Sequence, residues 1–136
     1  MMIEKTLLSV LAFIGLLIST YFQLVSRNKI APDAPFIPAW CRMESSACAS
    51  IVSAKEARLF GIPNFELGSF FYLLMLTATF MELPPDIRTG VVVVSGITVL
   101  VSAYLAFRLI SVLRIPCALC FISHVVNLLI FLLLVI

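Results

Sequence analysis

The chain has 136 residues, of which 62% are hydrophobic and only 12% are charged, and its mean hydropathy is +1.18. A soluble domain of this size cannot bury so much apolar surface, so the composition excludes a water-soluble globular protein and indicates an integral membrane protein. The formal net charge of +2 is small, and nothing in the sequence suggests binding to nucleic acid.

Four apolar windows are long enough to cross the hydrocarbon core of a bilayer, which needs about 20 helical residues. They lie near Leu7–Val25, Phe65–Met81, Val91–Leu113 and Pro116–Ile136. The first window is longer than a typical signal-peptide core and no small-residue cleavage site follows it, so we treat it as a retained helix. We predict an all-α integral membrane protein, with residues 1–136 forming a single four-transmembrane-helix bundle.

The loop between the first two windows, residues 26–64, is the long polar segment of the chain. Prolines between positions 32 and 38 predict an extended start. A short amphipathic helix is then expected from Ser46 through Leu59, ended by Gly61-Ile62-Pro63. A loop this long in so small a protein usually has a function.

The four cysteines form two dissimilar pairs. Cys41 and Cys48 lie in the long loop, whereas Cys117 and Cys120 form a Cys-x-x-Cys at the start of the last window. Because the second and third helices cross the membrane in opposite directions, the start of the fourth helix returns to the side that carries the loop, and all four cysteines are expected at one face of the membrane.

The Cys-x-x-Cys has the features of a reactive pair. Pro116 suits the first position of a helix, which would put Cys117 in the first turn, where free amides and the helix dipole favour a thiolate. Arg114 and Arg108 add positive charge nearby. Cys120, one turn further on, could form a disulfide with Cys117, so the predicted chemistry is thiol–disulfide exchange. The alternative is that these cysteines only pack.

A polar face continues along the last window. Cys117, Cys120, His124 and Asn127 are spaced to share one side of a helix. Polar groups in lipid are costly and should point into the bundle. His124 could therefore donate a hydrogen bond or a proton to a quinone carbonyl beside Cys120. The alternative is that the histidine and Asn127 join helices by hydrogen bonds, which we favour for Asn127.

Two other uses of the cysteines, a zinc site and structural disulfides, are alternatives to redox chemistry. A zinc site usually takes two tight cysteine pairs, whereas here one pair is wide and the other begins a helix, so no metal is predicted. Two structural disulfides are also possible. They would suit a non-enzymatic four-helix membrane scaffold or assembly protein, the alternative function. A small transporter would need more buried charge than this chain has.

The order of these elements resembles the vitamin K epoxide reductase family, in a short prokaryotic-looking form without a fused thioredoxin-like domain. The similarity covers nearly the whole chain. It depends on Trp40-Cys41 and Cys48 in the loop, Phe60-Gly61-Ile62-Pro63, the segment from Gly68 to Tyr72, and Cys117-Ala118-Leu119-Cys120. The resemblance implies a quinone-dependent thiol oxidoreductase that generates disulfides. Its acceptor would be menaquinone, ubiquinone or a similar membrane quinone.

The resemblance also implies roles for the cysteines. Cys41 would face a thioredoxin-like partner that supplies electrons, Cys48 would pass them to Cys117, and Cys120 would reduce the quinone.

Two further residues are implied in quinone binding. Asn64 stands where the family keeps an asparagine that hydrogen-bonds a quinone oxygen, and His124 stands where animal members have a tyrosine with a similar task. One departure is Ala54, at a position where the family often has a serine.

The basic residues predict an orientation in the cell membrane. On the cysteine side lie Arg27, Lys29, Arg42, Lys55, Arg58, Arg108 and Arg114, and on the opposite side lie Lys5 and Arg88. The positive-inside rule places the cysteines at the cytoplasmic face. Disulfides usually persist outside the cytoplasm, although hyperthermophiles are an exception, so the two arguments conflict. We favour the charge distribution.

Overall fold

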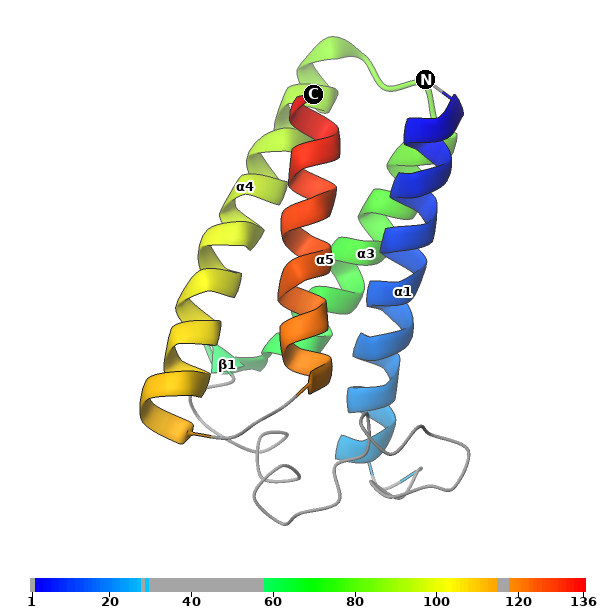
Figure 1. Ribbon diagram of the computed structural model, residues 1–136. Coiled ribbons are helices and arrows are strands. Elements are labelled where there is room, and N and C mark those ends of the chain that lie inside the picture. The colour runs from blue at the N-terminus through cyan, green and yellow to red at the C-terminus, as the bar shows by residue number, and fades with distance from the viewer. Residues whose placement is uncertain (1, 28, 30–57, 115–117) are drawn as a thin grey trace.

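The computed structural model of the protein describes residues 2–27, 29, 58–114 and 118–136. Within them the chain forms a bundle of long helices with a small β-hairpin (Figure 1). The elements are α1 (Met2–Ser26), β1 (Arg58–Leu59), β2 (Ile62–Pro63), α3 (Asn64–Phe80), α4 (Pro85–Arg108), η4 (Leu109–Leu113) and α5 (Ala118–Val135). The start of α1 and the end of α5 lie at one end of the bundle. The hairpin, η4 and the start of α5 lie at the other, which we call the redox end after the predicted role of Cys120 in the first turn of α5.

Three of the helical stretches are long and apolar enough to cross a membrane, namely Met2–Ser26, Pro85–Val112 and Ala118–Val135. Helix α3 has 17 residues, which is at the lower limit of the roughly 17–25 residues used by spanning helices. It runs beside α1, and its outward side chains include the exposed Phe70 and Leu73. The protein is therefore a helical membrane protein, and the crossing by α3 remains a prediction.

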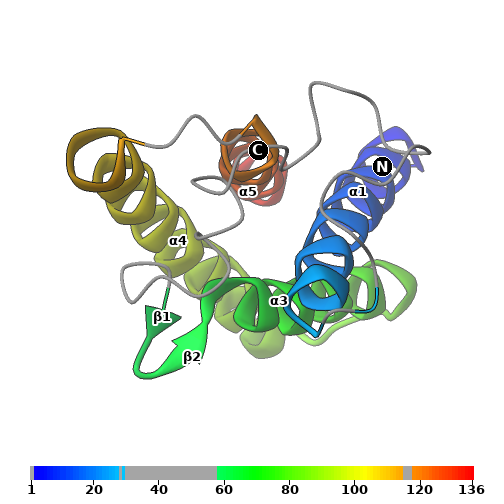
Figure 2. The same ribbon diagram turned by 90° about the horizontal axis from the view of Figure 1, so that it is seen from below.

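The helices pack through faces on which buried residues recur at regular intervals. Helix α1 packs against both α3 and α5, and α4 packs against α5 (Figure 2). The buried residues of α1 recur every three or four positions and include Leu8, Ala12, Gly15, Ser19 and Phe22. This periodicity gives α1 one continuous inward face, while residues such as Phe13 and Leu17 point outward.

Gly15 is a point of close approach between α1 and α3. A Cβ atom built on Gly15 would overlap the ring of Tyr72, which is itself almost completely buried. The absence of a side chain at Gly15 therefore creates the space that Tyr72 occupies.

We expect Gly15→Ala to destabilise the protein by about 1–3 kcal/mol, because the added methyl group must displace a buried aromatic ring or separate two helices. Thermal unfolding in detergent would measure this loss. Gly90→Ala is the matched control, since Gly90 is an exposed residue of α4 with no atom within 4 Å of a built Cβ. The control should be neutral or slightly stabilising. Equal melting temperatures for both variants would contradict the packing argument.

The segment before α3 is a hairpin and not the end of a helix. Leu59 pairs with Ile62, and the two residues between them, Phe60 and Gly61, have positive φ angles of 53° and 78°. Positive φ at both central positions is the type I′ turn, which joins short antiparallel strands. The predicted loop helix is therefore wrong for Arg58 and Leu59, and its remaining residues lie outside the described part of the chain.

Helix α4 differs from the prediction at both ends. The third apolar window was expected to begin near Val91, but the helix begins at Pro85, because proline suits the first helical position. At the other end the helix widens into the π-helical turn η4, and Arg114 then adopts a left-handed conformation with φ of 52°. A π-turn inside a long helix often marks a functional site.

Candidate functional site

The predicted polar face of α5 lies inside the bundle. Cys120, Ser123, His124 and Asn127 all contribute to the wall of one cavity at the redox end. Their spacing of three, four and seven residues places them on one side of α5. The expectation that this stripe points inward is therefore confirmed for the residues that the structure describes.

The cavity has a volume of about 70 Å³ and receives side chains from all four long helices. In addition to the α5 residues it is lined by Ser19, Phe22, Asn64, Phe65, Gly68, Tyr72, Leu105, Arg108 and Leu109. Its wall thus combines apolar and aromatic groups with a few polar ones, which is the usual composition of a small-molecule site.

Three of the six residues predicted for the site meet at this cavity. Asn64 comes from the first turn of α3, while Cys120 and His124 come from the first two turns of α5. Residues more than 50 positions apart in the sequence are therefore brought to one wall. The other three, Cys41, Cys48 and Cys117, lie outside the described residues, as does Pro116.

Cys120 is half-buried and its sulfur is disulfide-bonded. The three other cysteines of the chain lie outside the described residues. The half-buried cationic side chain of Arg108 lines the same cavity. A positive group there would favour negative charge on a sulfur or on a bound ligand.

His124 presents a buried polar atom. Its Nδ1 is inaccessible to solvent and has no hydrogen-bond partner among the described residues. An unsatisfied polar atom inside a membrane helix bundle is costly, so a ligand that supplies a partner would gain binding energy. This is the arrangement expected of a residue that binds a ligand.

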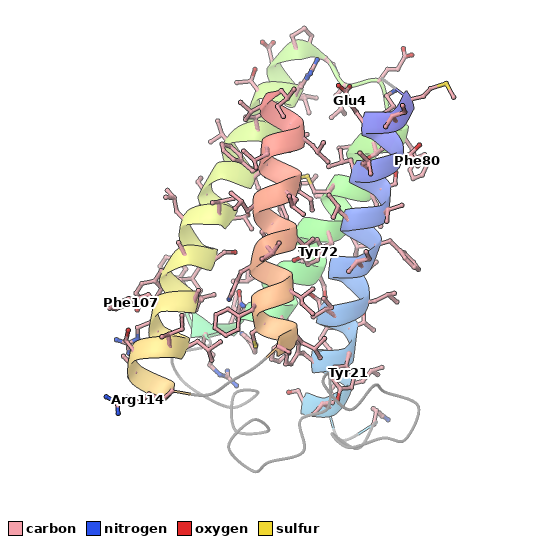
Figure 3. The ribbon with its side chains drawn as sticks, in the orientation of Figure 1. Glu4, Tyr21, Tyr72, Phe80, Phe107 and Arg114 are labelled. Carbon is pink, nitrogen blue, oxygen red and sulfur yellow. The ribbon has the colours of Figure 1, made fainter. Side chains whose placement is uncertain are left out.

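The side chain of Asn127 makes its hydrogen bonds to other residues of the protein. Tyr72 Oη donates a hydrogen bond to Asn127 Oδ1 at 2.6 Å, and Asn127 Nδ2 donates to Ser102 Oγ at 2.7 Å. Ser123 Oγ lies 3.5 Å from the same tyrosine oxygen. This polar link joins α3, α5 and α4, and its members Tyr72 and Asn127 form part of the cavity wall (Tyr72 is labelled in Figure 3). The role in joining helices that we favoured for Asn127 is thus what the structure shows.

The sequence reasoning did not identify Tyr72 and Ser19, which line the cavity, or Ser102, which accepts a hydrogen bond from Asn127. Tyr72 appeared only as the last residue of a segment shared with a known family, and a serine in an apolar helix is common enough to carry no signal. A possible clue was Gly68, because small residues allow helices to approach closely. A Cβ atom there would lie 2.9 Å from Ser19 Oγ.

A comparison with family models matches residues 6–135 to the model described as "Vitamin K epoxide reductase family". The chain belongs to this family. No curated protein matches the chain closely enough to be reported as a relative. As a vitamin K epoxide reductase family member with membrane-spanning helices, the protein is a membrane oxidoreductase of the thiol-dependent type. The family is linked to quinones in general.

Proposed function

We propose that the protein oxidises the dithiol of a thioredoxin-like partner and passes two electrons to a membrane quinone, thereby generating disulfides. The observation that carries this proposal is the meeting of Cys120, Asn64 and His124 at one cavity inside the helix bundle. A redox sulfur, a side-chain amide and an unsatisfied imidazole are the groups that a dithiol–quinone reaction needs. A disulfide with a purely structural role would need neither the amide of Asn64 nor the imidazole of His124.

The relay balances as three exchanges. The partner's two thiols reduce a Cys41–Cys48 disulfide, so that the partner leaves with a disulfide and two loop thiols are formed. The loop thiols then reduce a Cys117–Cys120 disulfide and become oxidised again. The resulting Cys117–Cys120 dithiol gives two electrons and two protons to the quinone, which leaves as the hydroquinone while the disulfide re-forms.

The residues of the cavity have distinct tasks in the last exchange. Cys120 lies beside the quinone and transfers the electrons as its disulfide closes. The Asn64 amide donates a hydrogen bond to one quinone oxygen, and His124 donates to another and supplies a proton as charge develops there. Arg108 stabilises negative charge on sulfur or on the reduced quinone. Menaquinone and ubiquinone both present two ring carbonyl oxygens, so these groups would serve either.

The relay predicts that Cys41→Ala separates two kinds of electron donor. Turnover driven by a thioredoxin-like protein should fall much further than turnover driven by dithiothreitol, because a small dithiol can reduce the Cys117–Cys120 pair directly. Quinol formation would be followed by absorbance with each donor, and Ser45→Ala in the same loop is the control. Equal losses with both donors would contradict separate roles for the two pairs. A scaffold with structural disulfides would form no quinol with either donor.

We also propose that the redox end faces the cytoplasm. Arg27, Lys29 and Arg58 flank the long loop, and Arg108 and Arg114 lie at the same end, while the described part of the opposite end carries Lys5 and Arg88. This asymmetry predicts a cytoplasmic redox end by the positive-inside rule. A membrane-impermeant maleimide should therefore label Cys41 in reduced, permeabilised cells but not in intact ones. Labelling of Cys41 in intact cells would show that the redox end faces the outside of the cell.

A further inference from the structure

A second cavity lies at the end of the bundle opposite Cys120. Its volume is about 350 Å³, compared with about 70 Å³ at the redox end. All four long helices contribute to it, and its apolar walls include Leu8 of α1, Ala78 of α3, Val91 of α4, and Leu133 and Leu134 of α5. The redox chemistry leaves this cavity without a role.

Charges of both signs surround the apolar walls. Lys5 and Arg88 line the cavity from α1 and α4, and Glu4 and Glu82 line it from α1 and from the connection after α3. The side chains of Lys5, Glu82 and Arg88 are exposed and make no hydrogen bond or ion pair with any described residue. The side chains of Lys5, Glu82 and Arg88 are therefore available to a ligand.

The position of the cavity narrows the class of ligand. The ends of membrane-spanning helices lie in the headgroup layer, and at this end Met2, Ile3 and Phe80 are exposed apolar side chains, as is usual next to lipid (Glu4 and Phe80 are labelled in Figure 3). An apolar cavity with two cations and two carboxylates at this level matches an amphiphile. Its phosphate would meet Lys5 and Arg88, and its ammonium group would meet Glu82.

We infer that this cavity binds a phospholipid with a zwitterionic headgroup and a primary ammonium, such as phosphatidylethanolamine. A quaternary ammonium is usually recognised by aromatic faces, and none of the described residues that line the cavity is aromatic. A primary ammonium instead donates hydrogen bonds to carboxylates, which are present. A lipid with only negative charge would place no cation against Glu82.

Native mass spectrometry of the full chain in detergent tests this inference. The protein would be mixed with equal amounts of dioleoyl phosphatidylethanolamine, phosphatidylglycerol and phosphatidylcholine, and the lipid retained would be counted. We expect phosphatidylethanolamine to be retained at least about tenfold over the other two, a difference of about 1.4 kcal/mol. Equal retention of the three lipids, or no retained lipid, would overturn the inference.

Variants locate the lipid. Arg88→Gln and Glu82→Gln should each remove the preference for phosphatidylethanolamine, and Lys29→Gln, which removes a cation beyond the opposite end of α1, should keep it. Ala78→Leu fills the apolar wall without changing any charge and should reduce retention of all three lipids. Unchanged retention in Arg88→Gln and Ala78→Leu would place the lipid elsewhere on the protein. Melting temperatures of all four variants would show that each one folds.

Discussion

Replacing Cys120 by alanine is expected to abolish quinone reduction, even when a strong dithiol is supplied in excess. Cys120 is the described cysteine that lines the cavity, and its sulfur takes part in a disulfide. Without that sulfur the two electrons have no covalent route to the acceptor. We expect turnover to fall by at least about 100-fold, which corresponds to roughly 2.7 kcal/mol in the activation free energy. Quinol formation in detergent or in proteoliposomes would measure it.

The controls separate chemistry from folding. Cys120→Ser keeps nearly the same shape but cannot exchange disulfides, and it should be as inactive as the alanine variant. Val125→Ala removes atoms from the exposed face of the same helix and should retain activity. Both cysteine variants should still unfold cooperatively in a thermal scan. Quinol formation at an undiminished rate in Cys120→Ala would refute the assignment of this cavity.

Replacing His124 by phenylalanine is expected to slow the quinone step by about 10- to 100-fold, at the lower end of what general acid catalysis contributes. The phenyl ring fills similar space but can neither donate a hydrogen bond nor supply a proton. Oxidation of the partner's thiols in a single turnover, with no quinone present, should be unchanged, because that exchange takes place between sulfurs. Steady-state kcat/KM for quinone and the single-turnover rate for thiol oxidation would together measure the effect.

His124→Gln distinguishes two forms of this role. Glutamine can donate a hydrogen bond but cannot transfer a proton, so an intermediate loss would indicate that both properties matter. A loss of rate in His124→Gln as large as that in His124→Phe would indicate that proton transfer is the main role of the histidine. If His124→Phe kept the full rate with quinone, the histidine would be a packing residue and Asn64 would remain the amide candidate for quinone binding.

Much of the fold follows from hydropathy. The windows expected at Leu7–Val25 and Phe65–Met81 correspond to α1 at Met2–Ser26 and α3 at Asn64–Phe80. Helix α1 begins earlier than predicted because Glu4, Lys5 and Thr6 continue the helix into the headgroup region, where a hydropathy window gives no signal. The π-turn of η4 could not be predicted, since Leu109–Leu113 is an ordinary apolar sequence with no local signal for a wider turn.

The candidate site was predictable to a different extent for each residue. The positions of Cys120 and His124 on one face follow from the helical period alone. Asn64 could be identified only through resemblance to a family, because an asparagine at the start of a helix is common for reasons of capping. The contact of Tyr72 with Asn127 could not be read from the chain, because the two residues are 55 positions apart and meet only when α3 and α5 pack.

The hairpin before α3 shows where local reasoning was wrong. Arg58 and Leu59 are compatible with a helix, and Gly61 was taken as its end. In the structure Gly61 is the second residue of a tight turn, and the Arg58 guanidinium donates a hydrogen bond to its carbonyl oxygen at 3.2 Å. A glycine with positive φ is found both at the end of a helix and in a tight hairpin turn. The pairing of Leu59 with Ile62 shows that Gly61 belongs to a hairpin turn.

The link from Tyr72 through Asn127 to Ser102 has a mechanical consequence. It fastens three helices to one another at a single depth, below the groups that would receive the acceptor. If the four walls part to admit or release a flat ring, they can tilt about this fastening but cannot slide past it without breaking two short hydrogen bonds. We therefore expect the helices to separate more readily at the end that contains Cys120 than at the opposite end.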